Sequence, residues 1–140
     1  MEKQVLHRAA SFGMGTKFLF AGFLDRQEVE SILSTTDIFV LPSVSEPFGI
    51  APLEAMSRGA VAIISKNAGV AEVIKNAYKI DFWDIDQMVN AILELVRNPD
   101  KLREMSKKSK QEVASLQWED AVRKISDIFR EVGKNEPCLI

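Results

Sequence analysis

The stretch that decides the fold runs from Asp37 to Met56 and reads DIFVLPSVSEPFGIAPLEAM. Its first five residues, Asp37–Leu41, are all apolar after the aspartate, so both faces of a strand formed by them would be apolar. This is typical of a strand buried on both faces. Pro42 ends this strand because proline has no N–H to donate to a ladder. After a loop, Pro52 marks the start of a helix that is expected to end at Gly59. A strand followed by a loop and a helix is the repeating unit of parallel α/β sheets.

Other apolar runs extend this unit in both directions. Strands are predicted at Lys17–Gly22 and Val61–Ser65, with a weaker one at Tyr78–Phe82. Asp25, followed three residues later by Glu28, predicts the start of a helix between the first two strands. We therefore expect an α/β fold with about four strands and flanking helices. Sheets of this type usually carry five or six strands and the chain opens in mid-helix, so the expected sheet is an incomplete doubly wound, Rossmann-like parallel sheet.

The C-terminal half is predicted to be helical. A short helix is expected around Ala71–Lys75, and Asp84 caps a long amphipathic helix. Pro99 opens the next helix. The last helix is expected to begin at about Trp118 and to stop at Gly133, where glycine permits a left-handed residue.

Composition limits the classes of function. The chain has 140 residues, of which 46% are apolar and 27% charged, as expected for a compact domain. We predict one domain over residues 1–133 and a flexible tail over 134–140. The net charge of −2 leaves no basic excess for nucleic acid. No apolar run approaches the roughly 18 residues of a membrane span. With Cys138 as the single cysteine, the sequence favours a reducing, cytoplasmic location.

The loop after Leu41 is the place where open parallel sheets bind ligands. Gly49 in this loop tolerates a positive φ and lets the backbone approach a ligand closely. The N–H groups of Gly49, Ile50 and Ala51 have no helical acceptor at a helix start, and the helix dipole favours negative charge there. The sequence therefore predicts a site that a phosphate would fit.

Two carboxylates flank this turn. Glu46 precedes it in the loop and Glu54 follows it in the helix, and carboxylates accept hydrogen bonds from hydroxyls. A ligand with phosphate in the middle and hydroxyl-bearing rings at both ends has the form of a nucleotide-sugar. The alternative is that Glu46 is a solvated loop acid and that Glu54 only complements the helix dipole.

The segments Glu46-Pro47-Phe48-Gly49 and Glu54-Ala55-Met56 resemble the Glu, seven residues, Glu motif of retaining glycosyltransferases with the GT-B fold. The resemblance is strongest to the large family that includes bacterial and archaeal glycogen synthases and sucrose and mannosyl transferases. Three further segments follow the order of that family's C-terminal domain: Phe20–Phe23, Val61–Ser65 and Gly69–Ile74.

The resemblance implies a donor-binding site. It places Glu46 beside the donor sugar as the catalytic carboxylate and Glu54 on the ribose hydroxyls. It places the backbone N–H groups of Phe48–Ala51 on the sugar hydroxyls and the distal phosphate, and the loop Gly22–Leu24 near the base. The implied substrate is a nucleotide-sugar such as ADP- or UDP-glucose, with transfer of the hexosyl group to a glycan acceptor and with no metal or other cofactor.

The sequence also departs from the family. The family's C-terminal domain begins with two strands and with an Arg- and Lys-bearing loop that neutralises the diphosphate, and this chain starts after them, without the N-terminal domain. We therefore expect little activity from the chain alone. The predicted strand at Lys17–Gly22 either closes beside Asp37–Leu41 or leaves an edge that a second copy of the chain covers. We therefore expect a self-associated state, and the expected partners are a nucleotide-sugar and either a second copy or the missing N-terminal half. The alternative function is a non-catalytic fragment or subunit that self-associates or completes a partner chain.

Overall fold

The computed structural model describes residues 2–135. The chain divides into two compact units, Met1–Ile32 and Leu33–Ile140, and each is described by itself.

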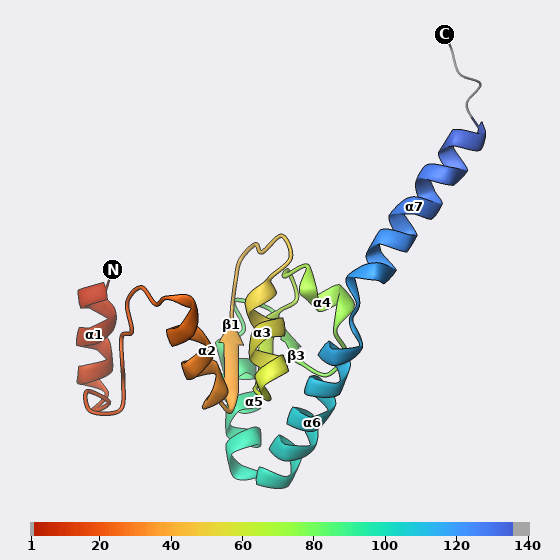
Figure 1. Cartoon of the computed structure of the whole chain (residues 1–140). Helices are drawn as coiled ribbons and strands as arrows, with labels where there is room; N and C mark the ends of the chain where they lie inside the picture. Colours follow the sequence, from red (N-terminus) through yellow and green to blue (C-terminus); the bar gives the residue numbers. More distant parts are fainter. Residues whose placement is uncertain (1, 136–140) are drawn as a thin grey trace. The chain divides into compact units, whose positions relative to one another are not determined.

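The N-terminal unit contains α1 (Glu2–Ser11) and most of α2 (Arg26–Ser34), as Figure 1 shows in red and orange. The predicted helix start at Asp25 is confirmed, because its Oδ1 accepts from the Glu28 N–H at 2.9 Å while its own N–H donates to Glu28 Oε2 at 2.8 Å. No side chain of residues 2–32 is buried. This unit therefore has helices and turns but no apolar core.

The strand predicted at Lys17–Gly22 is wrong. These residues form no strand, and the Leu19 side chain in their middle is 81% exposed. An apolar run becomes a strand only where another strand pairs with its backbone, and in the described structure no strand does so here.

The C-terminal unit is built on a parallel sheet of three strands, β1 (Ile38–Leu41), β2 (Val61–Ser65) and β3 (Tyr78–Ile80). The strands lie in the order β1-β2-β3, with Ile38 opposite Val61 and Ile63 opposite Tyr78. The α/β class and the parallel, Rossmann-like sheet are thus confirmed. The strand count among the described residues is three rather than four, because the Lys17–Gly22 run does not join.

Both faces of the sheet are covered, and every residue of β2 is buried. On one face, Ile64 packs with Met56 of α3 (Ile50–Arg58) and with Val70 of α4 (Val70–Val73). On the other face, Ile63 packs with Leu95 of α5 (Ile85–Arg97). The alternation of side chains along one strand therefore feeds two separate apolar clusters.

Helix α6 (Pro99–Ser115) holds the end of α3 and the segment between α4 and β3 through polar side chains. Ser106 Oγ donates to the Gly59 carbonyl at 2.6 Å, at the C-terminus of α3, and Ser109 Oγ donates to the Asn76 carbonyl at 2.8 Å. The Glu112 carboxylate accepts from the N–H groups of Lys75 and Asn76 at 2.6 and 2.8 Å and from Asn76 Nδ2 at 2.9 Å. Burial alone would raise the pKa of Glu112, but the hydrogen bonds from Asn76 and Lys75 together lower it.

Helix α7 (Trp118–Asn135) runs through Gly133 without a break, so the predicted stop at that glycine is wrong. Gly133 does not adopt a positive φ, unlike Gly59, whose φ of 104° closes α3 as predicted. A helix can continue through glycine at a cost of about 1 kcal/mol. Of the expected tail 134–140, residues 134 and 135 are helical and residues 136–140 lie outside the described residues. Among residues 2–135, no helix has the length and apolar character that crossing a bilayer requires.

Candidate functional site

The candidate site lies where β1 leaves the sheet and α3 begins. Gly49 takes φ 91° and ψ 81°, in the left-handed region, and Ile50 is the first helical residue. The helix thus begins two residues earlier than Pro52, where the sequence placed it. Pro52 is the third helical residue and is buried, and its missing N–H costs nothing because the first turn of a helix has no acceptors for its N–H groups.

The loop before α3 is held by backbone hydrogen bonds to a segment far along the chain. The Gly69 N–H donates to the Glu46 carbonyl at 3.0 Å and the Val70 N–H donates to the Phe48 carbonyl at 2.6 Å. Glu46 also forms an isolated parallel bridge with Ala68. The loop and the turn between β2 and α4 therefore lie side by side, so the backbone at the start of α3 is fixed before any ligand binds.

Position 69 requires glycine because this contact leaves no space for a Cβ atom. Its φ of −57° is open to any residue, but a Cβ there would lie 2.2 Å from the Pro47 carbonyl oxygen. The sequence indicates the Gly69 segment only through the family resemblance and does not indicate this role. No local signal could have indicated it, because the contact joins two segments that are distant in sequence.

The predicted site residues differ in their exposure and in their distance from the turn at Gly49. Glu46 is half-buried, and its Cγ would lie 3.1 Å from a Cβ at Gly49, so the side chain lies against the start of α3. Phe48 is 39% exposed, which rules out a core role for its ring, and Ile50 is 58% exposed. Glu54 is exposed and is the fifth residue of α3, four positions beyond the turn.

The first N–H groups of α3 have no side-chain cap. No side chain among the described residues caps this helix, in contrast to α5, where Asp84 accepts from the Gln87 N–H at 2.9 Å. Ile50 and Ala51 are exposed, so their N–H groups retain the capacity to bind an anion, whereas Gly49 is buried. Lys66, which follows β2, is engaged elsewhere, since its Nζ lies 2.8 Å from Asp81 Oδ2.

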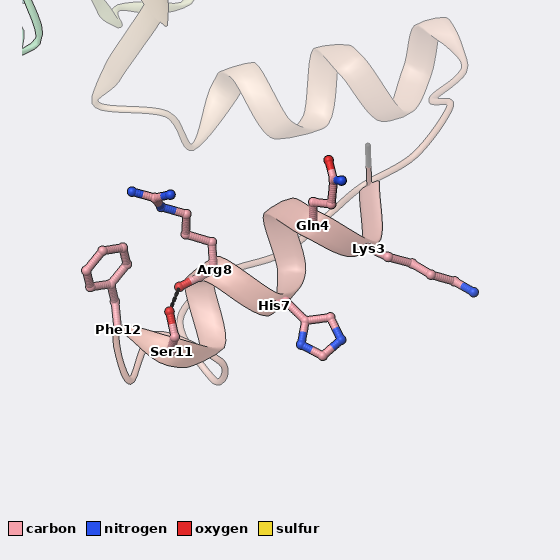
Figure 2. A pocket seen from close by; sticks show the side chains of 6 residues that line it. All are labelled: Lys3, Gln4, His7, Arg8, Ser11 and Phe12. Carbon is pink, nitrogen blue, oxygen red and sulfur yellow. Dashed lines mark hydrogen bonds between the residues drawn. The ribbon is translucent and has the colours of Figure 1, made fainter.

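Two surface hollows are lined by none of the residues of this site. One, of about 540 Å³, runs along a single helix and is lined by the residues in Figure 2: Lys3, Gln4, His7, Arg8, Ser11 and Phe12. Their side chains splay in different directions, and the single hydrogen bond drawn joins Ser11 Oγ to the Arg8 carbonyl. Because these side chains do not converge, the hollow forms no binding site.

The second hollow, of about 520 Å³, lies between β3 and α5. At its rim the Tyr78 hydroxyl donates to Glu94 Oε2 at 2.8 Å, and Lys101 Nζ donates to Glu94 Oε1 at 2.5 Å. The hydrogen bonds from Lys101 and Tyr78 lower the pKa of Glu94, while burial and the Glu94 contact raise the pKa of Tyr78. These exposed groups join β3, α5 and α6, and surface ion pairs of this kind add little stability.

The sheet order, the helices on both faces and the loop before α3 define the class of protein. Its fold is that of the Rossmann-like C-terminal domain of GT-B glycosyltransferases. A solved C-terminal domain of a group 1 glycosyl transferase family protein from Francisella tularensis superposes with a TM-score of 0.76 at 24% identity, over 81% of this chain and 60% of that one. Alr3699/HepE from Anabaena, solved in complex with UDP-glucose, superposes with a TM-score of 0.76 at 17% identity, over 92% of this chain and 36% of that one.

The chain belongs to the group 1 glycosyl transferases, whose family model matches residues 1–112. One relative is the UDP-Gal:alpha-D-GlcNAc-diphosphoundecaprenol alpha-1,3-galactosyltransferase of Escherichia coli. It is 32% identical over 115 residues, which are 79% of this chain and 30% of the relative. The chain spans no more than about a third of the length of the curated relatives that it matches.

Proposed function

We propose that the chain is the donor-binding part of a retaining glycosyltransferase, which transfers a hexosyl group from a nucleotide-sugar to a glycan acceptor. Glu46 is the carboxylate beside the reacting sugar. The backbone of Phe48, Gly49, Ile50 and Ala51 binds the sugar hydroxyls and the distal phosphate, and Glu54 binds the ribose. Membership of the group 1 glycosyl transferases supports the general activity.

The observation that carries this proposal is the geometry at Gly49. A positive φ of 91° turns the chain directly into α3 with no side-chain cap, and the hydrogen bonds from Gly69 and Val70 hold the preceding loop in place. Helix starts with free N–H groups stabilise negative charge, most strongly when no rearrangement is needed. A diphosphate at this turn would meet donors that are already oriented.

The donor is proposed to be UDP- or ADP-glucose. Support for a uridine nucleotide comes from the fold likeness to Alr3699/HepE, whose structure holds UDP-glucose. Glu54 suits the ribose because its side chain is exposed, and carboxylates accept hydrogen bonds from hydroxyls. Neither a metal nor another cofactor is part of the proposed reaction.

We expect the chain alone to turn over little or no donor. Stabilising the leaving diphosphate is usually the largest catalytic term and needs cations, and Lys66 is engaged by Asp81. The chain would then act with a second copy or with a partner that supplies the acceptor site. Incubation of the purified chain with UDP-[¹⁴C]glucose and glycogen should yield no labelled glycan, and robust transfer would refute the expected inactivity.

Thermal unfolding tests donor binding directly. At one hundred times its dissociation constant a ligand adds about 2.7 kcal/mol, enough to raise the midpoint by several degrees. We expect UDP or ADP at millimolar concentration to raise the unfolding midpoint of the chain. Glu54→Ala should abolish most of this rise, because the ribose contact is lost.

The matched control is Glu119→Ala. Glu119 is also exposed and lies on another helix, α7, so its removal makes the same change in net charge but touches no part of the proposed site. This variant should keep the full rise. If none of UDP, ADP and their glucose derivatives moves the midpoint, or if both variants lose the rise equally, the donor site is refuted.

A further inference from the structure

The turn between β2 and α4 contacts the loop before α3 through a side chain as well as through its backbone. Asn67 Nδ2 donates to the Val44 carbonyl at 3.2 Å. This hydrogen bond lies two residues before Glu46, and the backbone hydrogen bonds from Gly69 and Val70 follow it along the loop. Three carbonyls of the loop, each two residues from the next, therefore accept from one short segment.

The side chain of Asn67 takes the place of a backbone donor at the first of these contacts. Its own N–H is used within the turn, because it donates to Ser65 Oγ at 3.1 Å. Ser65 is the last residue of β2 and is fully buried, and buried hydroxyls are hydrogen-bonded in native structures. Ser65 thus orients the backbone of Asn67, and the amide side chain reaches the loop instead.

The hydrogen bonds along the loop hold different parts of the proposed site. The Val70 N–H binds the Phe48 carbonyl, next to Gly49, where α3 begins. The Asn67 amide binds on the other side of Glu46, toward the end of β1. Loss of the Asn67 hydrogen bond should therefore loosen Glu46 more than it loosens the N–H groups at the start of α3.

We propose that Asn67 is a positioning residue, which acts through the loop to hold the Glu46 carboxylate beside the sugar of a bound donor. This role rests on the proposed function, because Glu46 has a sugar to meet only if a nucleotide-sugar binds at this turn. Asn67 itself does not touch the donor in this arrangement. Its effect should be to favour the binding of the nucleotide-sugar over that of the free nucleotide.

Isothermal titration calorimetry of the full chain tests this preference with UDP and UDP-glucose, and in parallel with ADP and ADP-glucose. Asn67→Ala removes the amide donor and adds no charge. It should raise the Kd of the nucleotide-sugar about fivefold, which is the effect of about one hydrogen bond. The Kd of the free nucleotide should change by less than about twofold, as expected for a group that is not coupled to it. A general loss of stability would not change the ratio of the two constants.

The matched control is Asn90→Ala. Asn90 is also an exposed asparagine, and it lies on α5, which contributes no residue to the proposed site. Asn90→Ala should leave both dissociation constants and their ratio unchanged. Because Asn67 and Asn90 are both exposed, both variants should retain the far-UV circular dichroism of the unmodified chain.

Amide hydrogen exchange, followed by NMR without ligand, gives a second readout. The Gly69 N–H donates to the Glu46 carbonyl at 3.0 Å, so it exchanges when the loop opens. We expect Asn67→Ala to speed this exchange about fivefold, because one of the hydrogen bonds that close the loop is lost. Asn90→Ala should leave the exchange unchanged.

The outcomes separate the role of Asn67 from the existence of the donor site. If the unmodified chain binds none of the four nucleotides, the proposed function fails, and the Gly69 exchange alone decides whether Asn67 holds the loop. If the nucleotides bind but Asn67→Ala weakens the free nucleotide and the nucleotide-sugar equally, or weakens neither, the positioning role is refuted and the donor site stands. Unchanged Gly69 exchange in Asn67→Ala would overturn the role in either case.

Discussion

Two apolar runs of similar composition have opposite outcomes in this chain. Lys17–Gly22 and Val61–Ser65 both have the sequence pattern of a strand buried on two faces. The second is β2, with a strand on each side and every residue buried, whereas the first forms no strand and exposes Leu19 and Phe20. The difference teaches that the pattern specifies a potential strand, and that a strand forms only where a neighbouring strand pairs with it.

The largest expected difference in stability is between two variants that each shorten one side chain, one in each run. Ile64→Ala leaves a cavity beside Met56 and Val70 and should lower the free energy of unfolding by about 2–5 kcal/mol. Leu19→Ala removes a comparable side chain that is 81% exposed and should change stability by less than about 0.5 kcal/mol. Urea denaturation followed by circular dichroism measures both. A large loss in Leu19→Ala would mean that the first run is packed in solution.

A smaller effect is expected from adding a methyl group at one glycine in each unit. Gly69→Ala places its Cβ 2.2 Å from the Pro47 carbonyl oxygen, so the loop before α3 must shift, at a cost of about 1–3 kcal/mol. At Gly15 a Cβ meets no atom within 4 Å, and Gly15→Ala should be neutral. Thermal unfolding compares the two. If Gly69→Ala is as stable as the unmodified chain, the loop and the turn are not held together as described.

The polar contacts of the C-terminal unit should make its free energy of unfolding depend on pH. The pKa of Glu112 is lowered in the folded chain, so its contribution is present above the unfolded pKa, near 4.5, and is lost as the pH falls through the folded pKa. Glu112→Gln should cost about 1 kcal/mol at pH 7. The difference from the unmodified chain should shrink in urea titrations toward pH 3. A constant difference at all pH values would contradict this assignment.

The smallest effect should come from the helix caps. Asp84→Ala removes the cap of α5, which packs on the sheet, and should cost about 1 kcal/mol of global stability. Asp25→Ala removes the matching cap of α2, which begins in the unit without buried side chains. It should speed amide hydrogen exchange in the first turn of α2 and leave the global midpoint unchanged. A fall in the midpoint would show that the two units unfold together.

These contrasts explain how far the sequence could predict the fold. The strands at Asp37–Leu41 and Val61–Ser65, the caps at Asp25 and Asp84 and the end of α3 at Gly59 follow from local patterns. Lys17–Gly22 was mispredicted because strand formation depends on distant neighbours. Gly133 was mispredicted because a glycine that permits a left-handed residue does not require one.

The candidate site divides in the same way. The turn at Gly49 and the acid beside it could be predicted, since glycine at a helix start and a flanking carboxylate are local signals. The start of α3 at Ile50 could not be predicted. Pro52 is the residue type that usually marks a helix start, whereas the positive φ that Gly49 adopts is not visible in the sequence. The hydrogen bonds from Gly69 and Val70 join distant segments, and no local pattern records them. The placement of Glu54 on the ribose stays a prediction.

The close approach of Gly69 to Pro47 also limits which substitutions related sequences can accept at these positions. A side chain can enter position 69 only if the carbonyl of residue 47 moves away, and that movement would break the ladder that holds the Glu46 loop. Among related sequences we therefore expect the identity at position 69 and the length of the loop before α3 to vary together. The loop before α3 and the turn at Gly69 should therefore change together in evolution, although α3 and β2 lie between them in the chain.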